Sequence, residues 1–483
     1  MPVYTFYKKN IRHLRREFLC GLFLATSWTN IHADYDPDAI IDDIIYDGAM
    51  NTATSIGTIT PIYLTIHTIV IATTTKNIWT AKIRTHINSS RVRQIGKMAF
   101  ANCTFLSSVD FPHYLFIIGD KAFEYCTNLT SLSFPSSLTF IGHNAFYRCR
   151  KLSSATFPSS LQAIGDRAFS NCAALQSVKF SDKVVYIGEG AFENCVKIPA
   201  VSIPPSVTTL GAYVFSNCTS LTSVEGGTSV KHIQDGSYMN CTSLKTFDGF
   251  TSANTIGKQA FQGCTQLTAF NTPSSVRVIQ DEAFKGCTQL ASVIIPDNIS
   301  RLSAAVFEGC SSLQEVVFPD MEEQVILMER IFSGCSSLHK VILPHNMPAI
   351  GYATFRDCSS LKGIAIPSTV QSIGDSAFIG CTRLDSVCSY IEHPFEFGND
   401  AFKDISPRCV LTVPFGKRDA YIAAGWTEQI FKGGIKEMPE PAGIRPVTIG
   451  RSNSAYYDLQ GRRTTMPQKG KIYIHQGRKI RTR

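Results

Sequence analysis

The chain repeats itself every 23 residues over about three fifths of its length. Each copy has a cysteine, with an aromatic residue three positions before it and an aliphatic residue three positions after it. The cysteines are Cys103, Cys126, Cys149, Cys172, Cys195, Cys218, Cys241, Cys264, Cys287, Cys310, Cys335, Cys358 and Cys381, and a single step of 25 residues precedes Cys335. A fixed period in which apolar positions stay constant and polar positions vary indicates one structural unit stacked on its neighbours. The chain should therefore fold as a solenoid.

Each unit predicts one short strand followed by a return segment. The pattern Leu129-x-x-Leu132-x-Phe134 has the spacing of a leucine-rich-repeat strand, and the proline that follows lacks the N–H needed for further pairing. The next stretch returns the chain, with Gly142 for a tight turn and Ala145 for close approach of neighbouring turns. The expected fold class is an α/β solenoid, with short parallel strands on the concave face and a cap at each end.

The repeat consensus IGxxAFxxCxxLxxVxFPxSLxx resembles the BspA-like leucine-rich repeats of bacterial surface proteins of the Bacteroides type, over residues 92–387. The resemblance implies an exported protein that acts by binding, through adhesion to host matrix proteins, glycans or other cells. Two alternatives stay open. One is a structural scaffold of the cell envelope, and the other is an enzyme with a site in residues 34–91 or 388–440.

The cysteines are expected to form a buried spine of inert thiols beside a spine of aromatic rings. In a parallel stack, equivalent residues lie about 4.8 Å apart and point the same way, which does not suit disulfide geometry. Metal binding is disfavoured because the sequence has no C-x-x-C or paired histidine spacing. The cysteine should then be required for its volume rather than its chemistry. The spine residues chosen to represent this prediction are Cys126, Cys149, Cys172, Phe123, Phe146 and Phe169.

The N-terminal part of the chain predicts a leader and a cap. Residues 1–33 combine basic residues up to Arg16, an apolar run from Phe18 to Trp28 and a cleavage site at Ala33, which favours a signal peptide. A disordered basic leader is the alternative. Residues 34–91 are interpreted as a strand-rich N-terminal cap, and residues 92–387 as the array of thirteen repeats.

The C-terminal part predicts a second cap, a linker and a basic tail. The cap covers residues 388–436, and the sequence leaves open whether Cys388 and Cys409 form a disulfide there. Residues 437–450 have the composition of a linker. In residues 451–483, two short predicted strands resemble a type IX secretion sorting signal, through which the protein would attach to the outer surface. A solvated basic tail is the alternative.

The net charge of +8 does not indicate a nucleic-acid partner. The leader carries a net +4 and the tail a net +8, so the remainder of the chain is at −4 and mildly acidic. Catalytic motifs such as H-E-x-x-H and G-x-S-x-G are absent from the sequence. We therefore expect no catalytic residues, metal ligands or cofactor, and no stretch is apolar and long enough to predict a transmembrane segment.

The exposed positions of the predicted strands are the candidate ligand-binding face. Small hydroxyl side chains occupy many of them, and charged residues appear further along the array. The predicted binding residues are Lys179, Glu225, Lys245, Asp248, Glu315, His339, Lys340 and Lys362. A rigid ribbon of this kind suits a protein or glycan ligand held by many weak contacts. Breaks in the repeat near Gly226, Gly249, Thr272 and Asp320 are candidate bends or binding patches.

Overall fold

A computed structural model describes residues 70–71, 80–83, 86–87, 90–319 and 324–440, together with the backbone of four strands near the C-terminus. The predicted signal peptide, most of the predicted N-terminal cap, the inserted residues 320–323 and most of the predicted linker lie outside the described residues. Predictions for those segments remain predictions.

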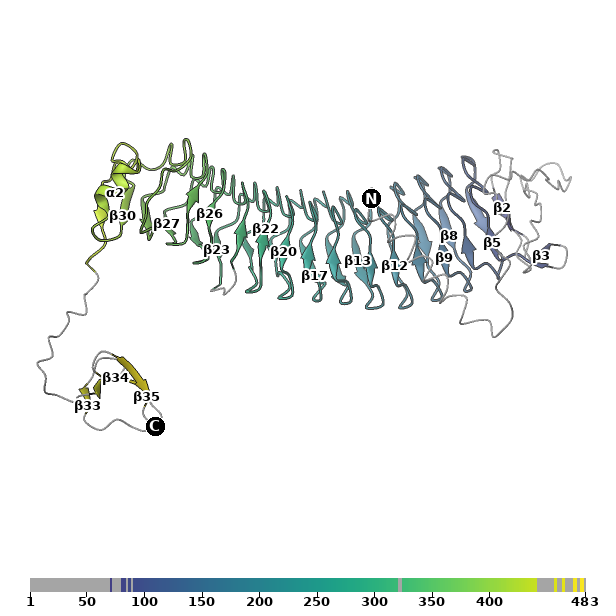
Figure 1. The fold of residues 1–483 in the computed structure, drawn as a ribbon. Helices are drawn as coiled ribbons and strands as arrows, with labels where there is room; N and C mark the ends of the chain where they lie inside the picture. The colour runs from purple at the N-terminus through teal and green to yellow at the C-terminus, as the bar shows by residue number, and fades with distance from the viewer. Residues whose placement is uncertain are drawn as a thin grey trace, which may run out of the picture. The chain divides into compact units, whose positions relative to one another are not determined.

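The described array is a coil with two ladders of parallel strands (Figure 1). The first ladder, here called the strand face, follows the leucine motif of each turn. Its members are β6 (Ser108–Asp110), β8 (Ser131–Ser133), β10 (Ser154–Thr156), β13 (Ala200–Ile203), β15 (Ser223–Gly226), β17 (Thr246–Gly249), β19 (Ala269–Phe270), β21 (Ser292–Val293), β23 (Glu315–Val317), β25 (Lys340–Ile342), β27 (Gly363–Ile366) and β29 (Ser386–Ser389).

The second ladder, here called the return face, consists of two-residue strands beside the Ile-Gly motif. Its members are β5 (Gln94–Ile95), β7 (Ile117–Ile118), β9 (Phe140–Ile141), β11 (Ala163–Ile164), β12 (Tyr186–Ile187), β14 (Thr209–Leu210), β16 (His232–Ile233), β18 (Thr255–Ile256), β20 (Val278–Ile279), β22 (Arg301–Leu302), β24 (Ile326–Leu327), β26 (Ala349–Ile350) and β28 (Ser372–Ile373). The sequence predicted a return segment here but no second set of paired strands.

The predicted solenoid is confirmed, and its register follows the repeat. On the strand face Ser131 pairs with Ser154, and on the return face Ala163 pairs with Tyr186, each 23 residues away. Within the described residues the only α-helix is α2 (Arg418–Ala423), so the turns between strands complete each coil without helices.

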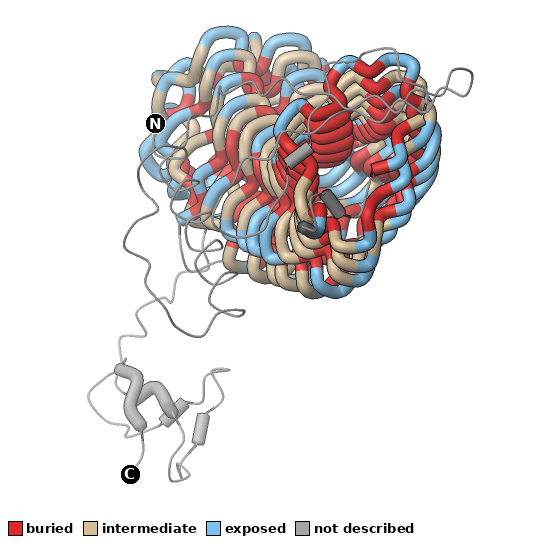
Figure 2. The backbone as a smooth tube through the Cα atoms, turned by 90° about the vertical axis from the view of Figure 1, so that its right-hand side faces the viewer, coloured by how far each residue is buried: buried red, intermediate tan, exposed pale blue. Residues whose placement is uncertain are grey.

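The core is a column of stacked aromatic rings that runs through the coil. It extends from Phe100 to Phe402 with one ring per turn; the centroid distance is 5.0 Å between Phe100 and Phe123 and 5.9 Å between Phe215 and Tyr238. Figure 2, an end-on view, shows the buried residues lining the interior of the coil. Since each ring contacts the rings of two neighbouring turns, no turn can bury its apolar side alone.

The ladder cysteines are buried thiols, as predicted. Each thiol from Cys126 onward donates a hydrogen bond to the carbonyl oxygen of the aromatic residue in the preceding turn, for example Cys172 to Phe146 at 3.2 Å. That carbonyl also accepts the backbone N–H of Cys149, so the thiol occupies its second acceptor position. The explanation by volume alone is therefore incomplete, because cysteine supplies both a small apolar body and a buried donor.

Glycine in the Ile-Gly motif is required by close packing between turns. A Cβ atom at Gly165 would lie 2.7 Å from the backbone carbon of Gly142 and 2.7 Å from the nitrogen of His143. The predicted reason, freedom to make a tight turn, applies instead to the residue before each cysteine. That residue has a positive φ in every turn, for example 62° at Asn171 and 72° at Gly286.

Parallel pairing continues into both segments predicted as caps. At the N-terminal end β2 (Thr80–Lys82) pairs with β6 and β1 (Val70–Ile71) pairs with β5, while β3 (His86–Ile87) and β4 (Ser90–Arg91) form an antiparallel pair. At the C-terminal end β30 (Val410–Val413) and β31 (Ile435–Glu437) extend the sheet from β29. At both ends, the terminal segments are therefore joined to the array by the same parallel strand pairing that joins its turns.

Cys388 and Cys409 do not form a disulfide and are both thiols. The pairing of β29 with β30 places Cys388 opposite Thr412, so Cys409 lies three residues back along the strand. Three residues of extended chain span about 10 Å, too far for a disulfide.

The C-terminal tail contains a small antiparallel sheet of four strands in the order β33-β32-β34-β35. These are β32 (Tyr456–Tyr457), β33 (Arg463–Thr464), β34 (Ile472–His475) and β35 (Arg478–Arg481). The sequence predicted two strands in this region.

Candidate binding surface

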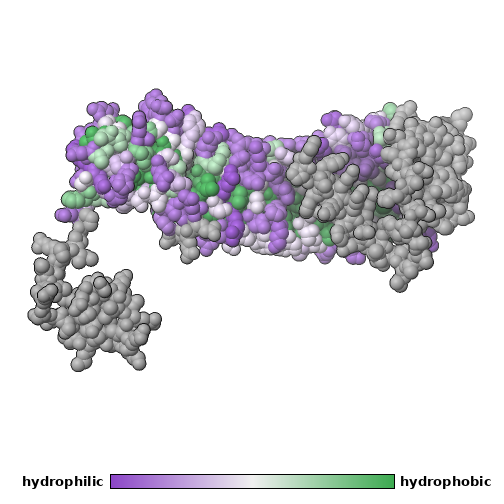
Figure 3. Space-filling view, viewed as in Figure 1, coloured by the Kyte–Doolittle hydropathy of each residue, from purple (hydrophilic) through white to green (hydrophobic). Residues whose placement is uncertain are grey.

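The strand face presents alternate side chains to solvent. In β8, Ser131 and Ser133 are exposed while Leu132 is buried, and β10 and β23 repeat this pattern. All of the predicted binding residues are exposed: Lys179, Glu225, Lys245, Asp248, Glu315, His339, Lys340 and Lys362. The return face buries its isoleucine or leucine and exposes or half-exposes the residue before it. Figure 3 shows patches of hydrophobic residues among the hydrophilic ones on the surface of the coil.

Several hydroxyl groups on this face already donate hydrogen bonds to the backbone. Thr130 donates to the carbonyl oxygen of Ser107 at 3.2 Å, Ser153 to that of Thr130 at 3.0 Å, and Thr222 to that of Pro199 at 2.8 Å. These donors tie one turn to the next, so a ligand would meet mainly their acceptor lone pairs. The hydroxyl ribbon is therefore less able to bind a ligand than the sequence suggested.

Three predicted residues form one polar cluster at β23 and the start of β25. Lys340 Nζ donates to Glu315 Oε2 at 3.0 Å, and His339 Nε2 lies 3.5 Å from Glu315 Oε1. The hydrogen bond from Lys340 and its positive charge lower the pKa of Glu315. Since the cluster is exposed, its charges neutralise one another locally but add little to stability.

Two other predicted residues, Glu225 and Asp248, are directly paired across β15 and β17. Their backbones are one strand spacing apart, about 4.8 Å, so two negative side chains stand side by side. Within the described part of the chain neither carboxylate forms an ion pair. Lys179 and Lys362 stand on separate turns and belong neither to the cluster around Glu315 nor to the Glu225–Asp248 pair.

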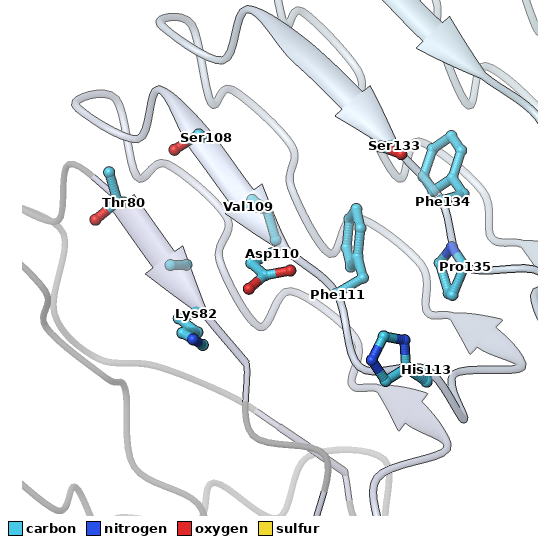
Figure 4. Close-up of a pocket in the computed structure, with 11 residues that line it drawn as sticks. Thr80, Lys82, Ser108, Val109, Asp110, Phe111, His113, Ser133, Phe134 and Pro135 are labelled. Carbon is cyan, nitrogen blue, oxygen red and sulfur yellow. The ribbon is translucent and has the colours of Figure 1, made fainter.

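A hollow of about 420 Å³ lies at the N-terminal end of the strand face (Figure 4). Its polar lining includes Lys82, Asp110 and His113, and its apolar lining includes Phe111 and Phe134. Lys82 and Asp110 face each other across β2 and β6. Sequence reasoning missed this hollow, because nothing in the predicted cap showed that β2 would add a strand to the ladder.

A cluster of polar side chains beside the return face was also not predicted. His143 Nδ1 lies 3.2 Å from Asp166 Oδ2 and 3.0 Å from the Asp166 backbone nitrogen, and Tyr186 donates to Asp166 Oδ1 at 3.0 Å. The hydrogen bond to Asp166 raises the pKa of His143. Asp166 also accepts the backbone N–H of Glu189 at 2.9 Å, so its carboxylate serves to join successive turns.

The described residues include no group of three or more His, Cys, Asp or Glu side chains arranged to hold a metal ion. Among the same residues, no helix is both long and apolar enough to cross a membrane.

Comparison with solved structures finds a leucine-rich repeat protein from Bacteroides ovatus. It is 26% identical, with a TM-score of 0.65, and the match covers 83% of this chain and all of the other. A leucine-rich cell surface protein from Faecalibacterium prausnitzii is 22% identical over 78% of this chain and 98% of its own, with a TM-score of 0.42. A leucine-rich repeat protein from T. pallidum is 24% identical over 44% of this chain and 87% of its own, with a TM-score of 0.33.

No curated protein matches the chain. The family described as the BspA type leucine rich repeat region matches in six copies, at residues 78–198, 162–291 and 278–408. These ranges include every ladder cysteine and both ladders of strands. As they also cover more than half of the sequence, the chain belongs to the family of BspA-type leucine-rich repeat proteins.

Proposed function

We propose that the protein is an exported binding protein of the cell surface that uses its strand face to hold protein or glycan ligands. The observation that supports this most directly is a contrast between the buried and the exposed positions of the repeat. The repeated residues are buried in one continuous core, whereas the exposed positions of the strand face differ from turn to turn. A rigid frame with a varied surface suits recognition of an extended partner.

Export and adhesion are the finer parts of the proposal. The signal-peptide pattern in residues 1–33 supports export, and the tail would provide attachment to the outer surface. Adhesion to host matrix proteins, glycans or other cells agrees with the membership of the BspA-type family. The proposed binding residues are Lys179, Glu225, Lys245, Asp248, Glu315, His339, Lys340 and Lys362.

The test is a binding assay of the full chain on immobilised extracellular-matrix proteins and on a glycan array. One variant replaces Lys245, Asp248, His339 and Lys340 by alanine. A matched control replaces four exposed residues on or near the return face, Lys231, His232, Asp297 and Arg301, by alanine. We expect the first variant to lose binding and the control to keep it, with both melting as the wild type does. If the control alone loses binding, the strand face is not the binding surface.

A further inference from the structure

Three exposed aliphatic side chains form a row on the strand face, here called the apolar row. They are Ile294, Val317 and Ile342, and their exposed fractions are 59%, 45% and 47%. Each stands four residues after the buried leucine of its turn. In the preceding turns this position holds a polar residue every time, namely Asp110, Ser133, Thr156, Lys179, Ser202, Glu225, Asp248 and Asn271.

The three residues of the apolar row stand at the same repeat position on successive turns. Val317 pairs with Ile342 across β23 and β25. The backbone N–H of Gln314 donates to the carbonyl oxygen of Ala291 at 3.3 Å, which places β21 on the adjoining turn. With turns about 4.8 Å apart, the row offers a continuous apolar strip about 10 Å long. Exposed apolar groups that lie together in this way are typical of interaction sites.

The charges near the apolar row differ on its two sides. Beside the row itself, Glu315 is paired with Lys340 at 3.0 Å, and His339 Nε2 lies 3.5 Å from its carboxylate. At the same position of the repeat, Asp248 stands two turns before the row begins and Glu225 stands three turns before it. Like charges that face each other across strands are destabilising, so a cation from a partner would relieve this pair.

From this arrangement we infer that the apolar row and the Glu225–Asp248 pair together take an extended segment of a partner protein. The segment carries aliphatic or aromatic side chains over the row and lysine or arginine about 10 Å further along, over the two carboxylates. It lies along the axis of the coil. Neutral glycans offer no cation for the carboxylates, so the chemistry favours a polypeptide. This inference rests on the proposed function and narrows its site and partner.

The probe is a fluorescent synthetic peptide of about eight residues, because six turns span about 24 Å and an extended chain rises about 3.3 Å per residue. It carries two lysines at one end and alternating leucine, valine and phenylalanine at the other. One control peptide replaces lysine by glutamate, and the second replaces the apolar residues by serine. Binding to the full chain is followed by fluorescence anisotropy at low and at moderate salt.

The row variant is Ile294→Ser with Val317→Ser and Ile342→Ser. Its matched control is Met98→Ser with Ile326→Ser and Tyr352→Ser, because these residues lie outside the row and are 47%, 48% and 44% exposed. We expect the row variant to bind the peptide about tenfold more weakly and the control to bind it within about twofold of wild type. Changing Glu225→Gln with Asp248→Asn should remove most of the salt dependence. Circular dichroism melting checks that all variants fold.

The inference is overturned if wild type does not distinguish the three peptides, or if both serine variants weaken binding equally. It is also overturned if the row binds anionic lipid vesicles instead of the peptide. A row variant that fails to bind the peptide yet keeps full binding to the matrix protein or glycan would place that ligand elsewhere. In that case the proposed function stands and only this location fails.

Discussion

Tyr238 is the one residue of the aromatic column that brings a polar atom into the core. Its ring stacks between Phe215 and Phe261, and its hydroxyl is buried with no hydrogen-bond partner within the described part of the chain. Burial raises its pKa well above the usual range. Tyr238→Phe should therefore stabilise the protein by about 1 kcal/mol, measured by urea denaturation. Phe261→Tyr is the converse control, and its failure to destabilise would contradict this explanation.

The position before each cysteine tests the need for a left-handed backbone. At Gly286 φ is 72°, and the nearest atom to an added Cβ would be the nitrogen of Gly263 at 4.0 Å, so space is not limiting. Gly286→Val should cost about 1 to 3 kcal/mol, whereas Gly286→Asn should be nearly neutral. Chemical denaturation compares the two. Equal costs would mean that backbone conformation is not what selects glycine or asparagine here.

At the scale of the element, the C-terminal end of the array is closed by a cluster of aromatic side chains around Trp426. Trp426 is fully buried, packs on Phe402 at a centroid distance of 5.6 Å, and donates from Nε1 to the carbonyl oxygen of Phe395 at 2.9 Å. Trp426→Ala should cost about 3 to 5 kcal/mol. In hydrogen exchange, the last turns should open first, while turns near Phe123 stay protected. Ile422→Ser, at an exposed site of α2, is the control.

The strand ladder and the two spines could be predicted from the sequence because they depend on apolar residues at a fixed period. The return ladder could not, since two residues of strand give no alternation to detect. Nor could the thiol hydrogen bonds, which depend on the carbonyl of Phe146 and its equivalents facing the next turn. The exposure of Lys245 and Asp248 was predictable from the alternation of buried and exposed side chains along a strand. The pairing of Glu315 with Lys340 was not, because it depends on rotamers.

At the scale of the whole molecule, the ladder of buried thiols should make the free energy of unfolding fall as the pH becomes alkaline. Burial raises the pKa of Cys241 and of Cys287 to about 12, compared with a usual value of 9.0. Between these values the unfolded chain loses protons that the folded chain keeps. Stability should be constant below about pH 8.5 and then fall, by up to about 1.4 kcal/mol per pH unit for each buried thiol.

Urea denaturation from pH 7.5 to 10.5 measures this fall. The double variant Cys241→Val with Cys287→Val should make the decline of stability with pH less steep. The control variant Lys245→Val, at an exposed site, should not change the steepness. Mass spectrometry after alkylation supplies a second readout, in which the ladder thiols are labelled only once the chain is unfolded. A stability that stays flat up to pH 10.5 would contradict the buried-thiol ladder.

The central claim is that the ligand lies on the strand face while the rest of the coil acts as a frame. Hydroxyl-radical footprinting of the full chain, with and without the matrix protein or glycan that it binds, tests this directly. We expect protection at exposed strand-face residues, above all Ile294, Val317 and Ile342, and unchanged labelling at Ile326 and Tyr352. Protection of Ile326 and Tyr352 with full labelling of the strand face would contradict the claim.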